Sequence, residues 1–453
     1  MTRSVVLVAF AAALVWPESG VVAQAAPPAP PPSVAPVRAA GDTTTTSYVV
    51  SGLRVIQRRV TANDVVAANL YLLGGTRQLS AGNQGVEALL FELSERGTRK
   101  YPKNLLRRRM ARLGSAIVAE PGIDWTIYGL RATTGGLDST WSIFADRLMA
   151  PTLDSAEFEL VRAQYLSGVR QRSDNPDALL HRLADSLAYA GHPYALEPIG
   201  SIESISGTRV SDLRRYRASQ MVTSRMLLVV VGNVDRAHVE RLVRTTIGKL
   251  PAGAYAWTLP AAPPPIPSTT LATVERALPT NYILGYYQGP PASSPDYQAL
   301  RVATAALSGR LYGEIRTRQN LTYAVEAPFI ERALATGGLY VTTVSPDTTL
   351  KLMHQEVADL QGDLLPEAGL ERLVQQFITE YFLDNETNAA QADFLARAQL
   401  FRGDYRTAER FVDELRAVTP DDVRRVSRLY MKHLRFAYVG DPAKISGAVV
   451  SAF

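Results

Sequence analysis

Short segments of alternating hydrophobic and polar residues run along the chain, between segments in which apolar residues recur every three or four positions. Alternation is typical of strands, and the wider spacing is typical of amphipathic helices. In the first half, strands are predicted over residues 48–60, 64–74, 115–119, 125–132 and 226–231. Helices are predicted over residues 85–95, 104–113 and 138–149, from Asp154 onward, and over 235–250. Strands mixed with helices in this order indicate an α+β fold.

The pattern starts again in the second half of the chain. Strands are predicted over residues 270–276, 281–288, 322–330, 338–344 and 434–439, and helices over 296–307, 350–364 and 366–383. Two dense apolar strands also end alike, one at Gly232-Asn233 and the other at Gly440-Asp441. The repeat indicates an internal duplication of about 200 residues. We therefore predict two homologous halves, each a mainly antiparallel sheet with helices packed on one side.

Length and composition support this division. The chain has 453 residues, of which 46% are apolar and 20% charged, values that are ordinary for a globular protein of two or more domains. Residues 252–267 are rich in Ala and Pro and include three consecutive prolines, which predicts a linker. We therefore place a first domain at residues 45–251 and a second at residues 268–453.

The first 44 residues differ from the rest in composition. Residues 1–25 combine a basic start, an apolar run from Val5 to Trp16 and the sequence Ala23-Gln24-Ala25, a pattern typical of a secretory signal peptide. Residues 26–44 contain six prolines and are predicted to form an extended tether. An uncleaved anchor is the alternative, although the run is short for a membrane span. We expect an exported, periplasmic protein without a stable membrane span in its mature chain.

Charge and cysteine content exclude several classes of site. The net charge is +5, and the longest basic cluster, Arg107 to Arg109, falls within a predicted helix whose charged face is interpreted as solvated. Nucleic-acid binding is therefore not expected. The chain has no cysteine, which excludes disulfides, thiolate metal sites and a cysteine nucleophile.

Several motifs carry a family resemblance. Residues 191–194 read Gly-His-Pro-Tyr, and residues 198–205 read Pro-Ile-Gly-Ser-Ile-Glu-Ser-Ile. Residues 309–323 read Gly-Arg-Leu-Tyr-Gly-Glu-Ile-Arg-Thr-Arg-Gln-Asn-Leu-Thr-Tyr, and the predicted helix over residues 85–95 is followed by Gly97-Thr98. Together these motifs resemble the insulinase/pitrilysin (inverted-zincin) metallopeptidases. The resemblance covers nearly all of residues 47–440, and it implies peptidase-like halves that form a clam-like chamber around a peptide.

The metal-binding motif of that family is absent. Where the family carries His-x-x-Glu-His, residues 88–92 read Ala-Leu-Leu-Phe-Glu. The resemblance puts the histidine ligands at Ala88 and Glu92, the general base at Phe91 and the third ligand at Gly168. These residues cannot complete a zinc site or take a proton from bound water. No two of the five histidines lie three to five residues apart, so we expect no substitute metal site.

The edge strand of the first half also departs from the family. The family carries Asn-Ala there, and the resemblance implies that this pair contacts the substrate backbone. The corresponding residues here are Val118-Ala119. Because valine has no side-chain amide, we expect this substrate contact to be lost together with the metal site.

The second half keeps an Arg and a Tyr seven residues apart, Arg316 and Tyr323. The resemblance implies that both reach toward a zinc site and donate hydrogen bonds to the substrate carbonyl and the oxyanion, where fixed donors stabilise developing charge. The alternatives are that Arg316 pairs with a local carboxylate and that Tyr323 packs in the sheet. Asn320 replaces a family glycine, and asparagine tolerates positive φ better than most residues.

The resemblance and its departures predict a division of labour between two chains. We expect a zinc-less subunit of a heterodimeric insulinase/pitrilysin-type peptidase, inactive alone, that supplies Arg316 and Tyr323 in trans to a homologous zinc-bearing subunit. Zinc is expected in the partner and no cofactor in this chain, and a peptide or unfolded protein is the expected substrate. The alternative is a non-catalytic peptide-binding or scaffolding subunit of an envelope complex. An autonomous peptidase is the third interpretation and has the least support.

Overall fold

The computed structural model describes residues 45–453, so the predicted signal peptide and tether lie outside the described residues. The first sheet has the strand order β1-β2-β6-β3-β5-β4. Neighbouring strands are antiparallel except β2 and β6, which run parallel. The strands are Thr45–Val50 (β1), Leu53–Arg59 (β2), Val65–Leu73 (β3), Ala116–Glu120 (β4), Trp125–Thr133 (β5) and Met226–Gly232 (β6).

The second sheet repeats this arrangement. Its order is β7-β12-β8-β11-β10, and β9 also pairs with β11. Strands β7 and β12 are parallel and the other pairs antiparallel, so both sheets have one parallel pair at the same place. This match confirms the two homologous halves. The strands are Thr270–Glu275 (β7), Asn281–Pro291 (β8), Val325–Glu326 (β9), Phe329–Ile330 (β10), Leu334–Thr343 (β11) and Arg435–Gly440 (β12).

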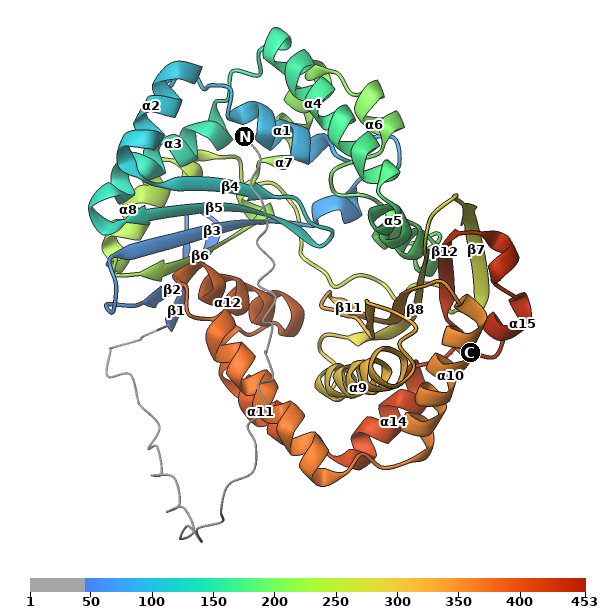
Figure 1. The fold of residues 1–453 in the computed structure, drawn as a ribbon. Helices are drawn as coiled ribbons and strands as arrows, with labels where there is room; N and C mark the ends of the chain where they lie inside the picture. The colour runs from blue at the N-terminus through green and yellow to red at the C-terminus, as the bar shows by residue number, and fades with distance from the viewer. Residues whose placement is uncertain (1–44) are drawn as a thin grey trace, which may run out of the picture. The chain divides into compact units, whose positions relative to one another are not determined.

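Helices follow the strands in matching order in the two halves (Figure 1). The first half contains Val86–Ser94 (α1), Lys103–Leu113 (α2), Leu137–Met149 (α3), Ser155–Asp174 (α4), Pro176–Ala188 (α5), Ile202–Gly207 (α6), Val210–Gln220 (α7) and Arg236–Thr245 (α8). The second contains Asp296–Leu311 (α9), Pro346–Gly362 (α10), Glu367–Asp384 (α11), Asn388–Arg402 (α12), Phe411–Arg416 (α13), Pro420–Tyr430 (α14) and Gly447–Val450 (α15). A π-helical turn, η6 (Tyr312–Arg318), continues α9.

Two predicted strands are wrong in detail. Residues 48–60 form a hairpin, because Ser51 and Gly52 both adopt positive φ, 51° and 80°, as a tight two-residue turn requires. The predicted strand over 322–330 is two strands of two residues each, β9 and β10. The segment that connects the two sheets, residues 251–266, forms neither helix nor strand. The division into domains at residues 45–251 and 268–453 remains a prediction.

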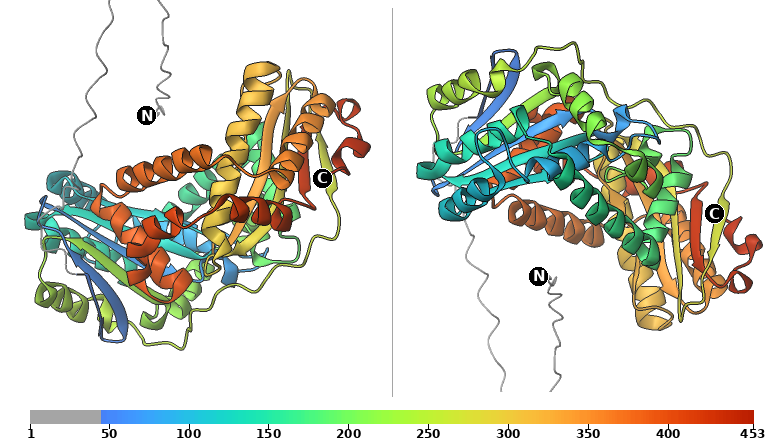
Figure 2. Two further views of the ribbon diagram at one scale, coloured as in Figure 1. Left: turned by 90° about the horizontal axis from the view of Figure 1, so that it is seen from below. Right: turned by 90° about the horizontal axis from the view of Figure 1, so that it is seen from above.

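One helix of each half packs on the sheet of the other half. Helix α12 lies against β3 and β6 of the first sheet, and α5 lies against β8 and β12 of the second (Figures 1 and 2). Each helix follows the long helix of its own half, so the exchange is reciprocal. The hydrophobic pattern predicts neither helix. No residue of α12 is exposed, and its polar residues do not gather on the single face that marks an amphipathic helix.

Alternation along the central strands gives each sheet two buried faces. In β6, Leu228 and Val230 belong to the core that the first half's own helices complete. The intervening Val229 and Val231 share a second core with Leu395 of α12. Successive strand residues point to opposite faces, so β6 needs apolar residues at every position. This requirement accounts for its unbroken apolar sequence.

Polar groups hold the exchanged helices in place. Arg332, which follows β10, forms a bidentate ion pair with Asp185 of α5, with distances of 2.8 and 3.1 Å. Burial disfavours the guanidinium charge, but Asp185 raises the pKa of Arg332 above its usual value. On the other sheet, the Asn388 side chain of α12 donates to the carbonyl of Val65 at 2.6 Å. Each helix is therefore fixed to the opposite half by specific hydrogen bonds as well as by apolar contact.

A buried turn at His192 forms a further link between the halves. The imidazole Nδ1 accepts from the backbone N–H of Tyr194 at 3.2 Å, and Nε2 lies 3.1 Å from the carbonyl of Ala261. The Tyr194 hydroxyl donates to Asp124 at 2.8 Å, and Asp124 also accepts from the backbone N–H of Ala333 in the second half. Burial lowers the pKa of His192 below its ordinary value of 6.5. The hydrogen bonds of this turn therefore favour the neutral form of the His192 imidazole.

The Asp185→Asn variant should lower the free energy of unfolding by about 2–3 kcal/mol, because it leaves the Arg332 guanidinium buried without its counter-charge. Urea denaturation of the full chain measures this change. Glu159→Gln is the control, since Glu159 forms an ion pair at the surface with Arg162, and we expect a change below about 0.5 kcal/mol. Equal changes in the two variants would contradict a locking role for Asp185.

The His192→Asn variant should remove one component of the pH dependence of stability. Because the folded-state pKa of His192 lies below 6.5, its stabilising contribution is complete above pH 6.5 and is lost as pH falls through the folded-state pKa. Protonation also turns Nδ1 from an acceptor into a donor and breaks the bond from Tyr194. Urea denaturation at pH 7.5 and 5.0 should show a smaller drop for the variant than for the natural chain. Identical drops would exclude His192 as the source.

Candidate functional site

The resemblance places the metal motif on α1, and two of its three motif positions, Ala88 and Phe91, belong to the core. Ala88 is 1% exposed and Phe91 is 2% exposed. The Phe91 ring stacks on Tyr128, with ring centroids 4.9 Å apart. Glu92 is more exposed and pairs with Arg96, one helical turn later, at 3.1 Å. The helix therefore presents packing surface where a zinc site would need two imidazoles and a base.

The helix predicted to bring the third ligand is α4. Gly168 is exposed, and no atom lies within 4 Å of the place a side chain would occupy. From the same helix the Tyr165 hydroxyl donates to the carbonyl of Ala88 at 3.4 Å, and burial raises the pKa of Tyr165 to about 12. Within residues 45–453 no three His, Cys, Asp or Glu side chains gather as a metal site would need. The residues present do not fit zinc.

The one carboxylate that α1 does bury, Glu87, has a structural partner that the sequence pattern did not reveal. Arg225 is completely buried and donates to Glu87 at 2.7 Å, and it also donates to the carbonyl of Leu73 at 2.8 Å. The Tyr216 hydroxyl donates to Glu87 at 2.7 Å. This network fixes α1 on the end of β3. The motif helix is thus retained as a structural element.

Strand β4 lies at the edge of the first sheet, as predicted. It pairs with β5 and has no strand on its other side among the described residues. Val118 and Ala119 are partly buried on this strand. The edge can still offer backbone groups, but the side-chain amide that the family uses there is missing.

Arg316 and Tyr323 lie together in the second half. Arg316 belongs to η6, and its guanidinium carbon lies 4.3 Å from the centre of the Tyr323 ring. One guanidinium nitrogen donates to the carbonyl of Thr322 at 3.0 Å. Neither alternative from the sequence describes the pair. Arg316 forms no ion pair with the described carboxylates, since the nearby Glu314 pairs with Arg318, and Tyr323 is 87% exposed.

The backbone under the pair is well supported. Asn320 adopts a φ of 51°, the conformation expected where the family has glycine. The N–H of Leu321 donates to the carbonyl of Ile315 at 3.0 Å. The buried Thr322 hydroxyl donates to the carbonyl of Ala324 at 2.9 Å. The exposed Tyr323 ring and the half-buried Arg316 side chain therefore lie on an ordered turn.

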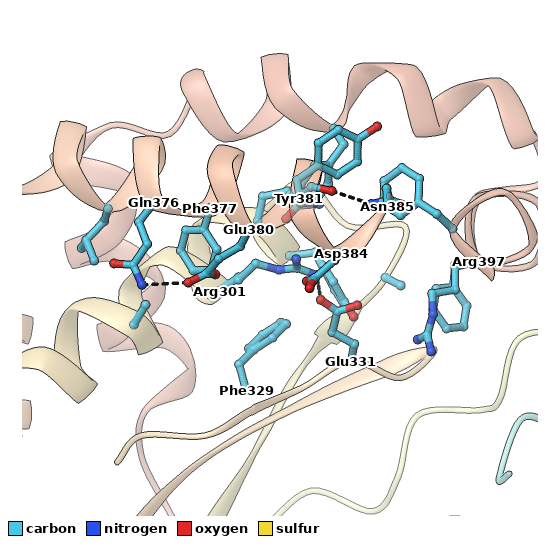
Figure 3. Close-up of a pocket in the computed structure, with 18 of the residues that line it drawn as sticks. Arg301, Phe329, Glu331, Gln376, Phe377, Glu380, Tyr381, Asp384, Asn385 and Arg397 are labelled. Atoms are coloured by element: carbon cyan, nitrogen blue, oxygen red, sulfur yellow. Dashed lines mark hydrogen bonds and ion pairs between the residues drawn. The ribbon is translucent and has the colours of Figure 1, made fainter. Parts of the chain in front are cut away.

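A cavity of about 1080 Å³ in the second half was not predicted from the sequence. Its walls come from α9, α11, α12 and the short strands β9 and β10 (Figure 3). On α11 its lining includes Phe377, Glu380, Tyr381 and Asp384, whose spacing of three and four residues puts them on one helix face. That spacing was visible in the sequence, but the elements that complete the cavity were not. Arg316 and Tyr323 do not line it.

The Phe91→Glu variant should lower the free energy of unfolding by about 3–5 kcal/mol, because it removes a stacked ring and buries a carboxylate. Phe91→Leu, the matched apolar change, should cost about 1–1.5 kcal/mol. Chemical denaturation followed by circular dichroism checks both values. A Phe91→Glu variant as stable as the natural chain would show that α1 still tolerates the family's base.

Two family models match the chain. Residues 54–200 match the insulinase family (peptidase family M16), and residues 209–377 match the peptidase M16 inactive domain. The first match lies in the first half, and the second runs from the end of the first half to residue 377 of the second. No helix among residues 45–453 combines the length and apolar character that crossing a membrane requires.

Sequence relatives extend over most of the chain. An uncharacterized zinc protease of Streptomyces coelicolor is 22% identical over 83% of this chain and 85% of its own length. The mitochondrial-processing peptidase subunit beta of Blastocladiella emersonii is 24% identical over 86% of this chain and 87% of its own length. The name of the second relative identifies it as one subunit of a peptidase.

Solved structures share the fold. A peptidase M16 inactive domain from Pseudomonas fluorescens superposes with a TM-score of 0.80, at 18% identity, over 88% of this chain and 98% of its own. The periplasmic protease PqqL of Escherichia coli gives a TM-score of 0.74 at 13% identity, over 89% of this chain and 47% of its own. With Ala88, Glu92 and Gly168 at the ligand positions and Phe91 at the base position, the chain belongs to the insulinase family of peptidases as a member without the catalytic motif.

Proposed function

We propose that this chain is the zinc-less subunit of a two-chain peptidase and supplies Arg316 and Tyr323 to the zinc site of a homologous partner chain. One observation carries the proposal. The ligand position Ala88 and the base position Phe91 belong to the core, whereas Arg316 and the exposed Tyr323 lie together on an ordered turn. A tyrosine ring that is 87% exposed contributes little to the core, so its position has a better explanation in contact with another molecule.

The chemistry of the pair suits peptide hydrolysis. Negative charge develops on the carbonyl oxygen of the peptide bond as it is attacked, and fixed donors outside the metal stabilise it. The bond from Arg316 to the Thr322 carbonyl and the contact with the Tyr323 ring set the plane of the guanidinium. Its other N–H groups make no further hydrogen bond to the described residues and are available to a substrate. The Tyr323 hydroxyl supplies a second donor.

The partner and the compartment follow from the same proposal. The partner would be a homologous chain with intact zinc ligands, and the substrate a peptide or unfolded protein. The signal-peptide pattern of residues 1–25 favours the periplasm, the compartment named for the related PqqL protease. The related mitochondrial-processing peptidase is named as a beta subunit, which supports an assembly of more than one chain.

A second candidate is a non-catalytic peptide-binding or scaffolding subunit of an envelope complex. The cavity between α9 and α11 favours it, because the cavity is large and does not involve the Arg316–Tyr323 pair. The two candidates differ in one measurable respect. A complementing subunit changes the turnover of its partner through two side chains, whereas a scaffold changes it through assembly alone.

In a mixture of this chain with its zinc-bearing homologue, Arg316→Ala should lower kcat about 100-fold or more with little change in KM. Tyr323→Phe should lower kcat about tenfold, because it removes one donor and keeps the ring. Steady-state hydrolysis of a quenched fluorescent peptide measures both. Arg318→Ala is the matched control, since Arg318 lies in the same turn and pairs with Glu314. Unchanged kcat in Arg316→Ala would refute the proposal and favour the scaffold.

A further inference from the structure

The cavity between α9 and α11 has a specific relation to the duplication. Helices α9 and α11 take the places in the second half that α1 and α4 take in the first, and β9 and β10 take the edge position of β4. Gly168 of α4 and Glu380 of α11 stand equally far from the first residues of their helices. Glu380 thus has a position along α11 that is comparable to the position of Gly168 along α4.

The cavity lining carries negative charge that the protein does not neutralise. Its arginines have carboxylate partners: Arg301 pairs with Glu331, Arg397 with Asp393 and Arg402 with Glu414. Glu380 and Asp384, which are exposed and one helical turn apart on α11, form no ion pair with any described residue. Glu380 accepts only a hydrogen bond from Gln376 at 2.8 Å. A ligand that suits this face brings a positive charge.

Two buried polar groups in the lining also lack partners. Gln298 is 7% exposed, and its Oε1 has no hydrogen-bond partner among the described residues. Nε of Arg301, three residues later on the same face of α9, has none either. Unpaired buried polar groups are costly, so a ligand that pairs with them gains free energy. The Gln298 oxygen can accept from a backbone N–H, and the neighbouring Arg301 Nε–H can donate to a backbone C=O, so the two groups match a peptide backbone.

The third feature of the lining is aromatic. Phe329, Phe377 and Tyr381 border the cavity, and Glu380 and Asp384 project from α11 toward the side formed by Phe329 and Glu331 (Figure 3). The guanidinium of Arg301 already lies 5.6 Å from the centre of the Phe329 ring. Aromatic faces attract cations and cover the methylene groups of long basic side chains. The wall therefore suits arginine or lysine in both charge and shape.

From these three features we infer that the cavity binds an extended peptide segment through a basic side chain. That side chain lies between Glu380 and Asp384, and the adjoining backbone pairs with Gln298 and Arg301. The choice of a peptide over a small amine rests on the proposed function, whereas the requirement for positive charge rests on the cavity alone. The site would hold a substrate segment away from the bond being cut.

Binding to the purified full chain, without partner or zinc, tests this inference. The probe is a fluorescein-labelled nonapeptide, Gly-Ser-Ala-Leu-Arg-Leu-Ala-Ser-Gly, followed by fluorescence anisotropy. The same peptide with neutral citrulline in place of arginine should bind at least tenfold more weakly. Affinity for the arginine peptide should also fall as salt is raised, because exposed charges are screened. Equal affinity for the two peptides would overturn the inference.

The double variant Glu380→Gln with Asp384→Asn should bind the arginine peptide about tenfold more weakly and the citrulline peptide as the natural chain does. Glu367→Gln with Glu371→Gln is the matched control, since both residues are exposed on α11 and lie outside the cavity. Circular dichroism checks that both variants fold. Unchanged affinity in the cavity variant, or an equal loss in the control, would overturn the inference.

Competition and activity separate the remaining outcomes. Argininamide that displaces the peptide with equal affinity would show a small-molecule site and refute the peptide. Peptide binding that persists while Arg316→Ala leaves the mixture fully active would uphold the cavity and refute complementation. The reverse pattern, a loss of activity in Arg316→Ala without charge-dependent peptide binding, would uphold complementation and refute the cavity.

Discussion

The reciprocal exchange of α5 and α12 is the constraint on which the rest of the structure depends. Each sheet has two apolar faces, and its own half supplies helices for only one of them. The other face is covered by a helix from the opposite half, so neither sheet is fully buried without both halves. Burial of apolar area is the main source of stability, and here it joins the two halves in one compact unit.

This constraint explains why the first half persists without its chemistry. Helix α1 has packing residues at the ligand position Ala88 and the base position Phe91, and Glu87 anchors it through Arg225. The first sheet, on which α12 packs, is therefore supported by α1 without a metal ion. The second half carries both proposed sites, the turn with Arg316 and the cavity beside α11. Under these proposals, structural and functional roles are divided between the halves.

Much of the fold could be predicted from the sequence, and particular residues show where prediction stopped. The alternation and apolar runs placed β3 and β6, and Asp154 marked the start of α4, where it accepts from two backbone N–H groups. Helix α12 has no exposed face and gave no amphipathic signal. Nothing in a helix sequence says which sheet will cover it. The cavity was missed for the same reason, since its lining comes from segments that only the tertiary fold brings together.

The exchange also has the form of a domain-swapped dimer whose two chains have been joined. A single ancestral half could have lent its helix to a second copy across a symmetric interface. Fusing two copies turns a concentration-dependent association into an intramolecular one. Once joined, the copies no longer had to remain identical, because each needed only to keep the helix and the sheet that its neighbour uses. The connection between the sheets thus marks the point from which one half could specialise as scaffold and the other as site.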